Sequence, residues 1–165
     1  RDFAKMPTAN FEEYSLSDQL CEIAMPYDSE VNITCDIEED LPQFYGDKMQ
    51  MKQVFVNLVQ NAIQSMDSVN DGELLIKAAY EEPNFVITIA DNGSGIPEED
   101  MKNIFKPYFT KKKKGTGLGL AIVKRIVQSH EGTIEVESEP KEGTIFTITI
   151  GLSRDSRNKY GEIET

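Results

Sequence analysis

The amino-acid sequence predicts an α/β fold, a two-layer sandwich in which about three helices cover one face of a mixed, mostly antiparallel sheet. Segments with apolar residues at helical spacing are interspersed with segments in which every second residue is apolar, and such mixtures pack as a sheet backed by helices. The chain has 165 residues, of which 39% are hydrophobic and 28% charged. These values are typical of one globular domain and too apolar for a disordered chain.

The first part of the chain is predicted to hold two helices and a strand. Residues 1–12 are polar and are interpreted as a linker. A helix is expected over Ser15–Met25, where apolar residues share one face, a serine can cap the start and a proline follows the end. Alternating apolar residues around Ile33 predict a strand, and the apolar spacing from about Gly46 to Met66 predicts a longer helix.

The rest of the chain is predicted to contain four strands and a third helix. The strands are expected at Glu73–Tyr80, Asn84–Ala90, Thr133–Ser138 and Thr144–Gly151. The helix is expected at Leu118–Ser129, between the two pairs of strands. The loop before it, Asp91–Gly117, is longer than small domains usually contain unless the loop is functional. A polar tail, residues 153–165, ends the chain.

Charge and composition argue against several classes of function. The chain has 17 lysines and arginines against 29 aspartates and glutamates, a net charge of −12. Such acidity argues against sequence-independent nucleic-acid binding, which depends on clustered cations. No apolar run approaches the roughly 18 residues that a membrane-spanning helix needs.

Cysteine and histidine are too few for several familiar sites. Cys21 and Cys35 are the only cysteines, and His130 is the only histidine. Their number and spacing argue against a zinc site or a disulfide framework, so reduced thiols in a cytoplasmic setting are the simplest interpretation. A single histidine also argues against a Ser-His-Asp or Cys-His hydrolase.

Two glycine-rich segments give the first indication of chemistry. In DNGSGIP, Asp91–Pro97, a carboxylate at a strand end can accept from an amino group while the glycines let the backbone turn closely around a planar ligand. In GTGLGL, Gly115–Leu120, free N–H groups at a helix start favour an anion. Each segment alone is also compatible with an ordinary turn, and the second matches neither the Walker nor the dinucleotide-binding pattern.

Polar side chains elsewhere suggest how phosphates would be held. Asn57 and Asn61 are four residues apart and therefore share one face of the predicted helix. An amide oxygen suits Mg²⁺, although two solvated asparagines would look the same in sequence. The run Lys111–Lys114 is the strongly positive segment of an acidic chain and can provide a cation to a terminal phosphate; the sequence does not show which lysine does so.

Four segments together resemble the catalytic, ATP-binding domain of bacterial sensor histidine kinases. QVFVNLVQNAIQSM (Gln53–Met66) is similar to the family's N box, DNGSGIP to its G1 box, IFKPYFT (Ile104–Thr110) to its F box and GTGLGLAIV (Gly115–Val123) to its G2 box. Four boxes in the family's order are far more specific than any one of them, and the resemblance covers residues 11–152. The form NAIQSM resembles the nitrogen-regulation type of sensor kinase.

The resemblance implies a Bergerat fold with a mobile ATP lid. Residues 1–12 would then be the linker from an absent dimerisation hairpin, and residues 13–152 the ATP-binding catalytic domain. It implies that ATP binds with Mg²⁺, that Asn61 ligates the metal, and that Asp91, helped by Thr144, accepts from the adenine amino group. The further residues implied are Asn57, Gly93, Gly95, Ile96, Thr116, Gly117, Leu118, Gly119 and Leu120 for ATP, and Phe105, Phe109, Lys111, Lys112, Lys113, Lys114 and Gly115 for the lid.

For function, the resemblance implies that the domain donates the γ-phosphoryl group of Mg-ATP to a histidine on a separate dimerisation domain. The parent kinase would be a homodimer that acts on a response regulator and can be anchored in a membrane; this fragment is expected to be a monomer that binds no nucleic acid. Gln64 departs from the family, which often has a basic residue there. Gly132 and a strand pattern follow His130, which is therefore interpreted as a helix-end histidine and not as the phosphoacceptor.

Three alternatives stay open at the level of sequence. Bergerat-fold ATPases place a glutamate that activates water four residues before the Mg²⁺-binding asparagine, but this chain has Asn57 there, and an amide cannot act as a general base. Serine kinases of the same fold match the F box less well. A module that binds or senses ATP without transferring phosphate is the third, and the complete boxes argue against it.

Overall fold

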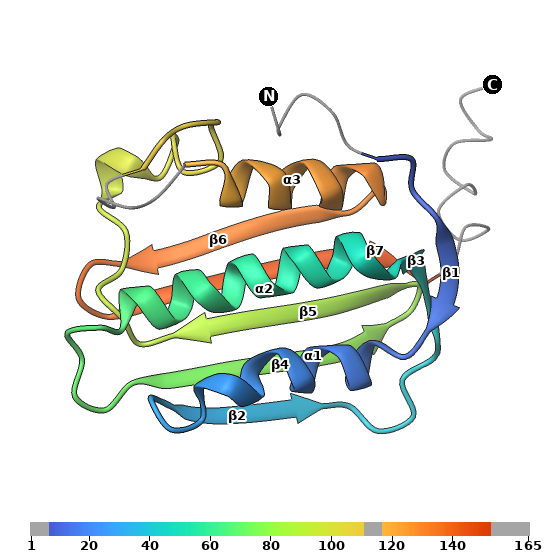
Figure 1. The fold of residues 1–165 in the computed structure, drawn as a ribbon, viewed down its shortest axis with the longest axis horizontal. Helices are drawn as coiled ribbons and strands as arrows, with labels where there is room; N and C mark the ends of the chain where they lie inside the picture. The colour runs from blue at the N-terminus through green and yellow to red at the C-terminus, as the bar shows by residue number, and fades with distance from the viewer. Residues whose placement is uncertain (1–6, 111–116, 153–165) are drawn as a thin grey trace.

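The computed structural model describes residues 7–110 and 117–152 of the chain (Figure 1). In this part a five-stranded sheet carries three helices on one face, so the predicted two-layer α/β sandwich is confirmed. The helices are α1 (Leu16–Ala24), α2 (Lys48–Ser65) and α3 (Gly119–Ser129). None of the helices in the described part is long and apolar enough to cross a membrane.

In the main sheet, a strand from the middle of the chain pairs with a strand from near its end. Its strand order is β2-β4-β5-β7-β6. The strands are β2 (Asn32–Ile37), β4 (Glu73–Glu81), β5 (Asn84–Asp91), β6 (Thr133–Glu139) and β7 (Gly143–Gly151). β2 and β4 run parallel, whereas every other neighbouring pair is antiparallel. Asp91 at the end of β5 lies directly opposite Thr144 near the start of β7, so the sheet brings two predicted site residues together.

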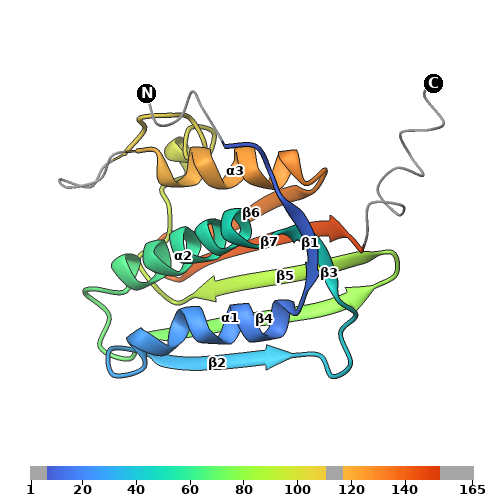
Figure 2. The same cartoon turned by 45° about the vertical axis from the view of Figure 1, so that its right-hand side comes forward.

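A second, two-stranded ribbon was not predicted. β1 (Phe11–Tyr14) pairs antiparallel with β3 (Phe44–Asp47), and Figures 1 and 2 place both strands at one end of the helix layer. The sequence analysis assigned the start of β1 to the linker and the end of β3 to the following helix. Both strands have only four residues and little alternation, and their partners are far apart in sequence, so neither gives a periodic signal.

The long helix α2 fixes the position of the site through its buried face. Asp47 caps it, because the carboxylate accepts from the N–H of Gln50 at 2.9 Å. Apolar side chains that recur every three or four residues are buried against the sheet; they are Met51, Val54, Phe55, Leu58, Val59 and Ala62. The flank beside this face carries Asn57 and Asn61, which are thereby held in place next to the core.

His130 joins three elements at the end of α3. It is the C-cap residue of that helix and is fully buried. Its Nε2 accepts from the Asp47 N–H at 3.0 Å, which leaves Nδ1 to donate to the Ile126 carbonyl at 2.9 Å. The ring also stacks on Phe11 of β1, with centroids 4.6 Å apart. The interpretation of His130 as a helix-end histidine is therefore confirmed.

The expectation of two reduced thiols is wrong. Cys21 in α1 and Cys35 in β2 form a disulfide, with their Cα atoms 6.2 Å apart. The two residues meet because α1 packs over the edge of the sheet that β2 forms. The two cysteines are 14 residues apart in the chain, and this spacing alone does not predict that they form a disulfide.

Candidate functional site

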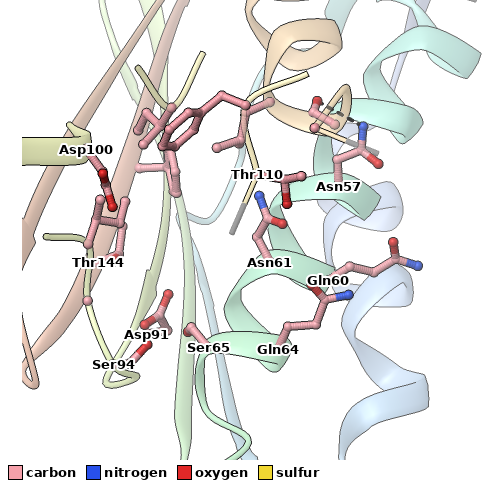
Figure 3. A pocket seen from close by; sticks show the side chains of 18 of the residues that line it. Asn57, Gln60, Asn61, Gln64, Ser65, Asp91, Ser94, Asp100, Thr110 and Thr144 are labelled. Carbon is pink, nitrogen blue, oxygen red and sulfur yellow. Dashed lines mark hydrogen bonds between the residues drawn. The ribbon is translucent and has the colours of Figure 1, made fainter. Parts of the chain in front are cut away.

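All four boxes converge on one cavity of about 630 Å³, a volume typical of small-molecule sites (Figure 3). One wall comes from α2, one from the start of α3 and one from the end of β5 and the loop after it. The predicted site residues that line it are Asn57, Asn61, Asp91, Gly95, Ile96, Phe109, Gly117, Gly119, Leu120 and Thr144. Segments more than 80 residues apart in sequence thus meet at one place.

Asp91 and Thr144 form a polar pair on the sheet side of the cavity. Burial raises the pKa of the Asp91 carboxyl above its usual value of 3.8, although hydrogen bonds from the backbone N–H groups of Gly93 and Thr144 oppose that shift. The Gly93 bond measures 2.8 Å. Asp91 is half-buried and Thr144 almost fully buried, so a ligand group that reaches them leaves water behind.

The loop after Asp91 is held from two sides. On one side the N–H of Ser94 donates to the Ser65 carbonyl at 2.9 Å, and on the other the N–H of Lys141 donates to the Ser94 carbonyl at 2.6 Å. Gly95 has a φ of +73°, and a Cβ there would collide with the Glu139 carbonyl, so this position requires glycine. The loop is therefore a fixed wall of the cavity.

Side-chain amides face Asp91 across the cavity. Asn57, Gln60, Asn61 and Gln64 all line it from α2, as Figure 3 shows. Asn57 also donates from Nδ2 to the Gly119 carbonyl at 3.3 Å and so ties α2 to the start of α3. Among the described residues that line the cavity, none is a lysine or an arginine.

The residues of this wall fit a magnesium ion that is bound together with a ligand. The described residues contain no group of three or more histidine, cysteine, aspartate or glutamate side chains that would hold a metal by itself. Mg²⁺, however, keeps several waters and is usually held by one or two protein oxygens together with substrate phosphates. The amide oxygen of Asn61, inside the cavity, suits that mode of binding.

The start of α3 and the F box close the third side. The N–H of Tyr108 donates to the Gly117 carbonyl at 2.8 Å, and Gly117, with a φ of +73°, leaves no room for a Cβ beside Tyr108. Gly119 and Leu120 begin α3 and line the cavity, so its N-terminal N–H groups lie at the site. Residues 111–116, which include the predicted lid lysines, Gly115 and Thr116, lie outside the described residues.

Three predicted residues lie beside the cavity and not in it. Gly93 packs so closely on Ser65 that a Cβ would collide with it. Leu118 is the N-cap residue of α3. Phe105 packs edge-on against Phe146, with ring centroids 6.3 Å apart, which supports the wall from behind.

The sequence analysis named Gln64 only as a departure from the family and missed several other lining residues, among them Gln60, Ser65, Ser94 and Asp100. Gln60 and Ser65 were within reach of sequence reasoning, because each lies three or four residues from Asn57 or Asn61 and hence on the same helix face. A second cavity, of about 720 Å³, lies between α1 and α2. No described residue of the two glycine-rich segments lines this second cavity, so the first cavity is the candidate site.

Comparison with known proteins identifies the family. Residues 46–154 match the family model described as histidine kinase-, DNA gyrase B-, and HSP90-like ATPase. Sporulation kinase C of Bacillus subtilis (strain 168) is 35% identical over 159 residues, which cover 93% of this chain. The chain spans only 37% of the length of that relative.

Solved structures of histidine kinases have the same fold. The nucleotide-free catalytic domain of the histidine kinase ThkA superposes with a TM-score of 0.76 at 31% identity, and the match covers 89% of this chain and 99% of that one. The structure of ThkA in complex with the response regulator protein TrrA matches with a TM-score of 0.75 at 25% identity, over 92% of this chain and 44% of that one.

Proposed function

Because this chain belongs to the family of histidine kinase-, DNA gyrase B- and HSP90-like ATPases and is the ATP-binding catalytic domain of a sensor histidine kinase, we propose that its cavity holds Mg-ATP for transfer of the γ-phosphoryl group to a histidine on a separate dimerisation domain. The observation that carries this proposal is the convergence of the N, G1, F and G2 boxes on one cavity. A response regulator would be the partner downstream.

At the sheet side, Asp91 and Thr144 receive the purine. The Asp91 carboxylate accepts a hydrogen bond from the exocyclic amino group of adenine, and the neighbouring Ile96 covers the ring. Burial of this pair strengthens the bond, because less water competes for the carboxylate. A purine with a carbonyl in place of the amino group would place one hydrogen-bond acceptor against another, the Asp91 carboxylate, and should therefore bind poorly.

At the opposite side, α2 and α3 receive the phosphates. The N-terminus of α3 at Gly119 binds phosphate oxygens, and the amide oxygen of Asn61 ligates Mg²⁺. When bound, Mg²⁺ neutralises part of the phosphate charge. Its contribution is large here because the described lining has no cationic side chain.

The residue at position 57 favours transfer over hydrolysis. Asn57 is an amide whose Nδ2 donates to the Gly119 carbonyl, and an amide cannot remove a proton from water. His130 cannot receive the phosphoryl group, because it is fully buried with both ring nitrogens hydrogen-bonded and does not line the cavity. The acceptor therefore comes from another domain.

The decisive experiment combines this chain with radiolabelled ATP, Mg²⁺ and a purified dimerisation hairpin from the same protein. We expect acid-labile, base-stable phosphate on the hairpin, and none when the hairpin histidine is replaced. An unlabelled hairpin together with rapid release of inorganic phosphate would favour the ATPase branch of the family instead.

A further inference from the structure

Ser138 lies behind the cavity and was not singled out by the sequence. It is on β6, directly opposite Thr144 of β7, and its side chain is partly buried. Its Oγ accepts from the Ile96 N–H at 2.8 Å and donates to the Gly143 carbonyl at 2.9 Å. The same oxygen lies 2.9 Å from Oγ1 of Thr144. A hydroxyl that does not itself line the cavity thus contacts both the loop after Asp91 and the buried threonine.

Counting protons fixes the direction of the bond between the two hydroxyls. The Ile96 N–H brings its own proton to Ser138, whereas the Gly143 carbonyl brings none and can only accept. The single hydroxyl proton of Ser138 is therefore used on Gly143, and the contact with Thr144 needs the proton of Thr144. Thr144 donates to Ser138, and all three hydrogen-bonding positions of the Ser138 oxygen are filled.

This direction determines what Thr144 offers to a ligand. Thr144 is one of the residues that line the cavity, and with its proton turned toward Ser138 its hydroxyl oxygen has only lone pairs to offer to a ligand. Asp91, which faces Thr144 across the pair of strands, presents carboxylate lone pairs to the same space. Two oxygens at the purine end therefore accept hydrogen bonds, and neither donates one.

We propose that Ser138 is a positioning residue that keeps Thr144 an acceptor and thereby makes the site select a 6-amino purine over a 6-oxo purine. The proposal rests on the proposed function, in which Asp91 and Thr144 face the adenine. Without Ser138, the Thr144 hydroxyl can rotate and donate to a 6-oxo group, directly or through a water. A 6-amino group, in contrast, needs acceptors and gains nothing from that rotation.

The test measures Mg-ATP and Mg-ITP affinity by calorimetry, because the base of ITP carries a 6-oxo group and a protonated N1 where adenine has a 6-amino group and an unprotonated N1. We expect the parent domain to prefer ATP by at least about tenfold, and Ser138→Ala to reduce that preference by about fivefold, the worth of one ordinary hydrogen bond. Ser138→Thr keeps the hydroxyl on a strand that tolerates branching and should keep the preference within about twofold of the parent.

A double variant separates positioning from simple support of the loop. Thr144→Val removes the hydroxyl that Ser138 orients, so Ser138→Ala should change the ATP preference no further in that background. Equal losses of ATP and ITP affinity in Ser138→Ala, or additive effects of the two substitutions on the preference, would overturn the proposal. If Ser138→Ala does not fold, Ser138→Cys, with its weak hydrogen bonding, should narrow the preference in the same direction.

The proposed function has its own readout in the same experiment. Unchanged ATP affinity in Asp91→Asn would remove the adenine assignment on which this inference rests. If ATP affinity falls in Asp91→Asn but Ser138→Ala leaves the preference for ATP over ITP unaltered, the adenine assignment stands and only the role of Ser138 is overturned.

Discussion

At the scale of single residues, the proposed adenine contact of Asp91 predicts how tightly ATP is held. Asp91→Asn replaces one acceptor oxygen by a donor that faces the adenine amino group. A hydrogen bond to a charged group is worth about 1.5–3 kcal/mol, so ATP affinity should fall at least about tenfold in calorimetry. Asp67→Asn, an exposed position that does not line the cavity, is the matched control and should bind ATP as the parent does.

The raised pKa of Asp91 predicts opposite effects of acid on binding and on stability. As the pH falls through this pKa, above 3.8, the carboxyl becomes a donor and ATP affinity should fall. The folded domain holds the proton more tightly than the unfolded chain, so Asp91 destabilises the fold above its folded pKa, and this penalty disappears as the pH falls toward 3.8. The ATP affinities of the parent and of Asp91→Asn are compared by calorimetry at each pH, so that the titration of ATP itself cancels. Identical pH profiles of affinity in the two proteins would contradict the prediction.

Asn61 gives a prediction about the metal. Asn61→Ala should weaken ATP binding by about tenfold or more with Mg²⁺ and by less than about twofold in EDTA, because only the metal-bound complex uses the amide oxygen. Gln60→Ala, the preceding residue on the same cavity wall, is the control and should show no such difference. Equal loss with and without Mg²⁺ would mean that Asn61 acts through helix packing.

Which single residues the sequence could predict depended on how they act. Asp91, Asn57 and Asn61 stand in continuous motifs, so their positions were predicted and the structure brings them to one cavity. Ser138 acts through partners on a neighbouring strand and a loop 42 residues away. Such a role depends on strand register, which sequence periodicity alone does not provide.

At the scale of elements, His130 predicts how firmly the end of α3 is attached. His130→Ala leaves the Asp47 N–H without its acceptor and opens a space under Phe11, so the free energy of unfolding should fall by about 2–4 kcal/mol. Urea denaturation measures this, with the exposed neighbour Gln128→Ala as control. A fall in the free energy of unfolding of less than about 1 kcal/mol would show that the contacts of His130 contribute little to stability.

Elements were predictable where their periodicity was strong. The three helices and the strands of the main sheet agree with the apolar spacing to within a few residues. The ribbon of β1 and β3 and the disulfide between Cys21 and Cys35 were not predicted. Each depends on contact between segments that carry no local pattern of their own, so only the packed structure reveals them.

At the scale of the whole molecule, the charge of the chain bears on how it can hold a nucleotide. The chain carries a net charge of −12, and the described cavity lining adds no cation. Under the proposed function, a polyanionic nucleotide would therefore be held through Mg²⁺ and the N–H groups of α3. Under the proposed function, this domain supplies the nucleotide site and another domain supplies the acceptor histidine.

The behaviour of the chain by itself follows from this division. Phosphoryl transfer depends mainly on positioning, and the acceptor must reach the γ-phosphate in line. Because His130 is buried away from the cavity and Asn57 is no base, the isolated chain should bind Mg-ATP, hydrolyse it slowly at most and not label itself. Phosphorylation of a separate hairpin should be weaker than in a covalently joined protein, since the linker's effective concentration is lost. Autoradiography of the isolated chain checks that it does not label itself. Self-labelling that His130→Ala abolishes would contradict the prediction.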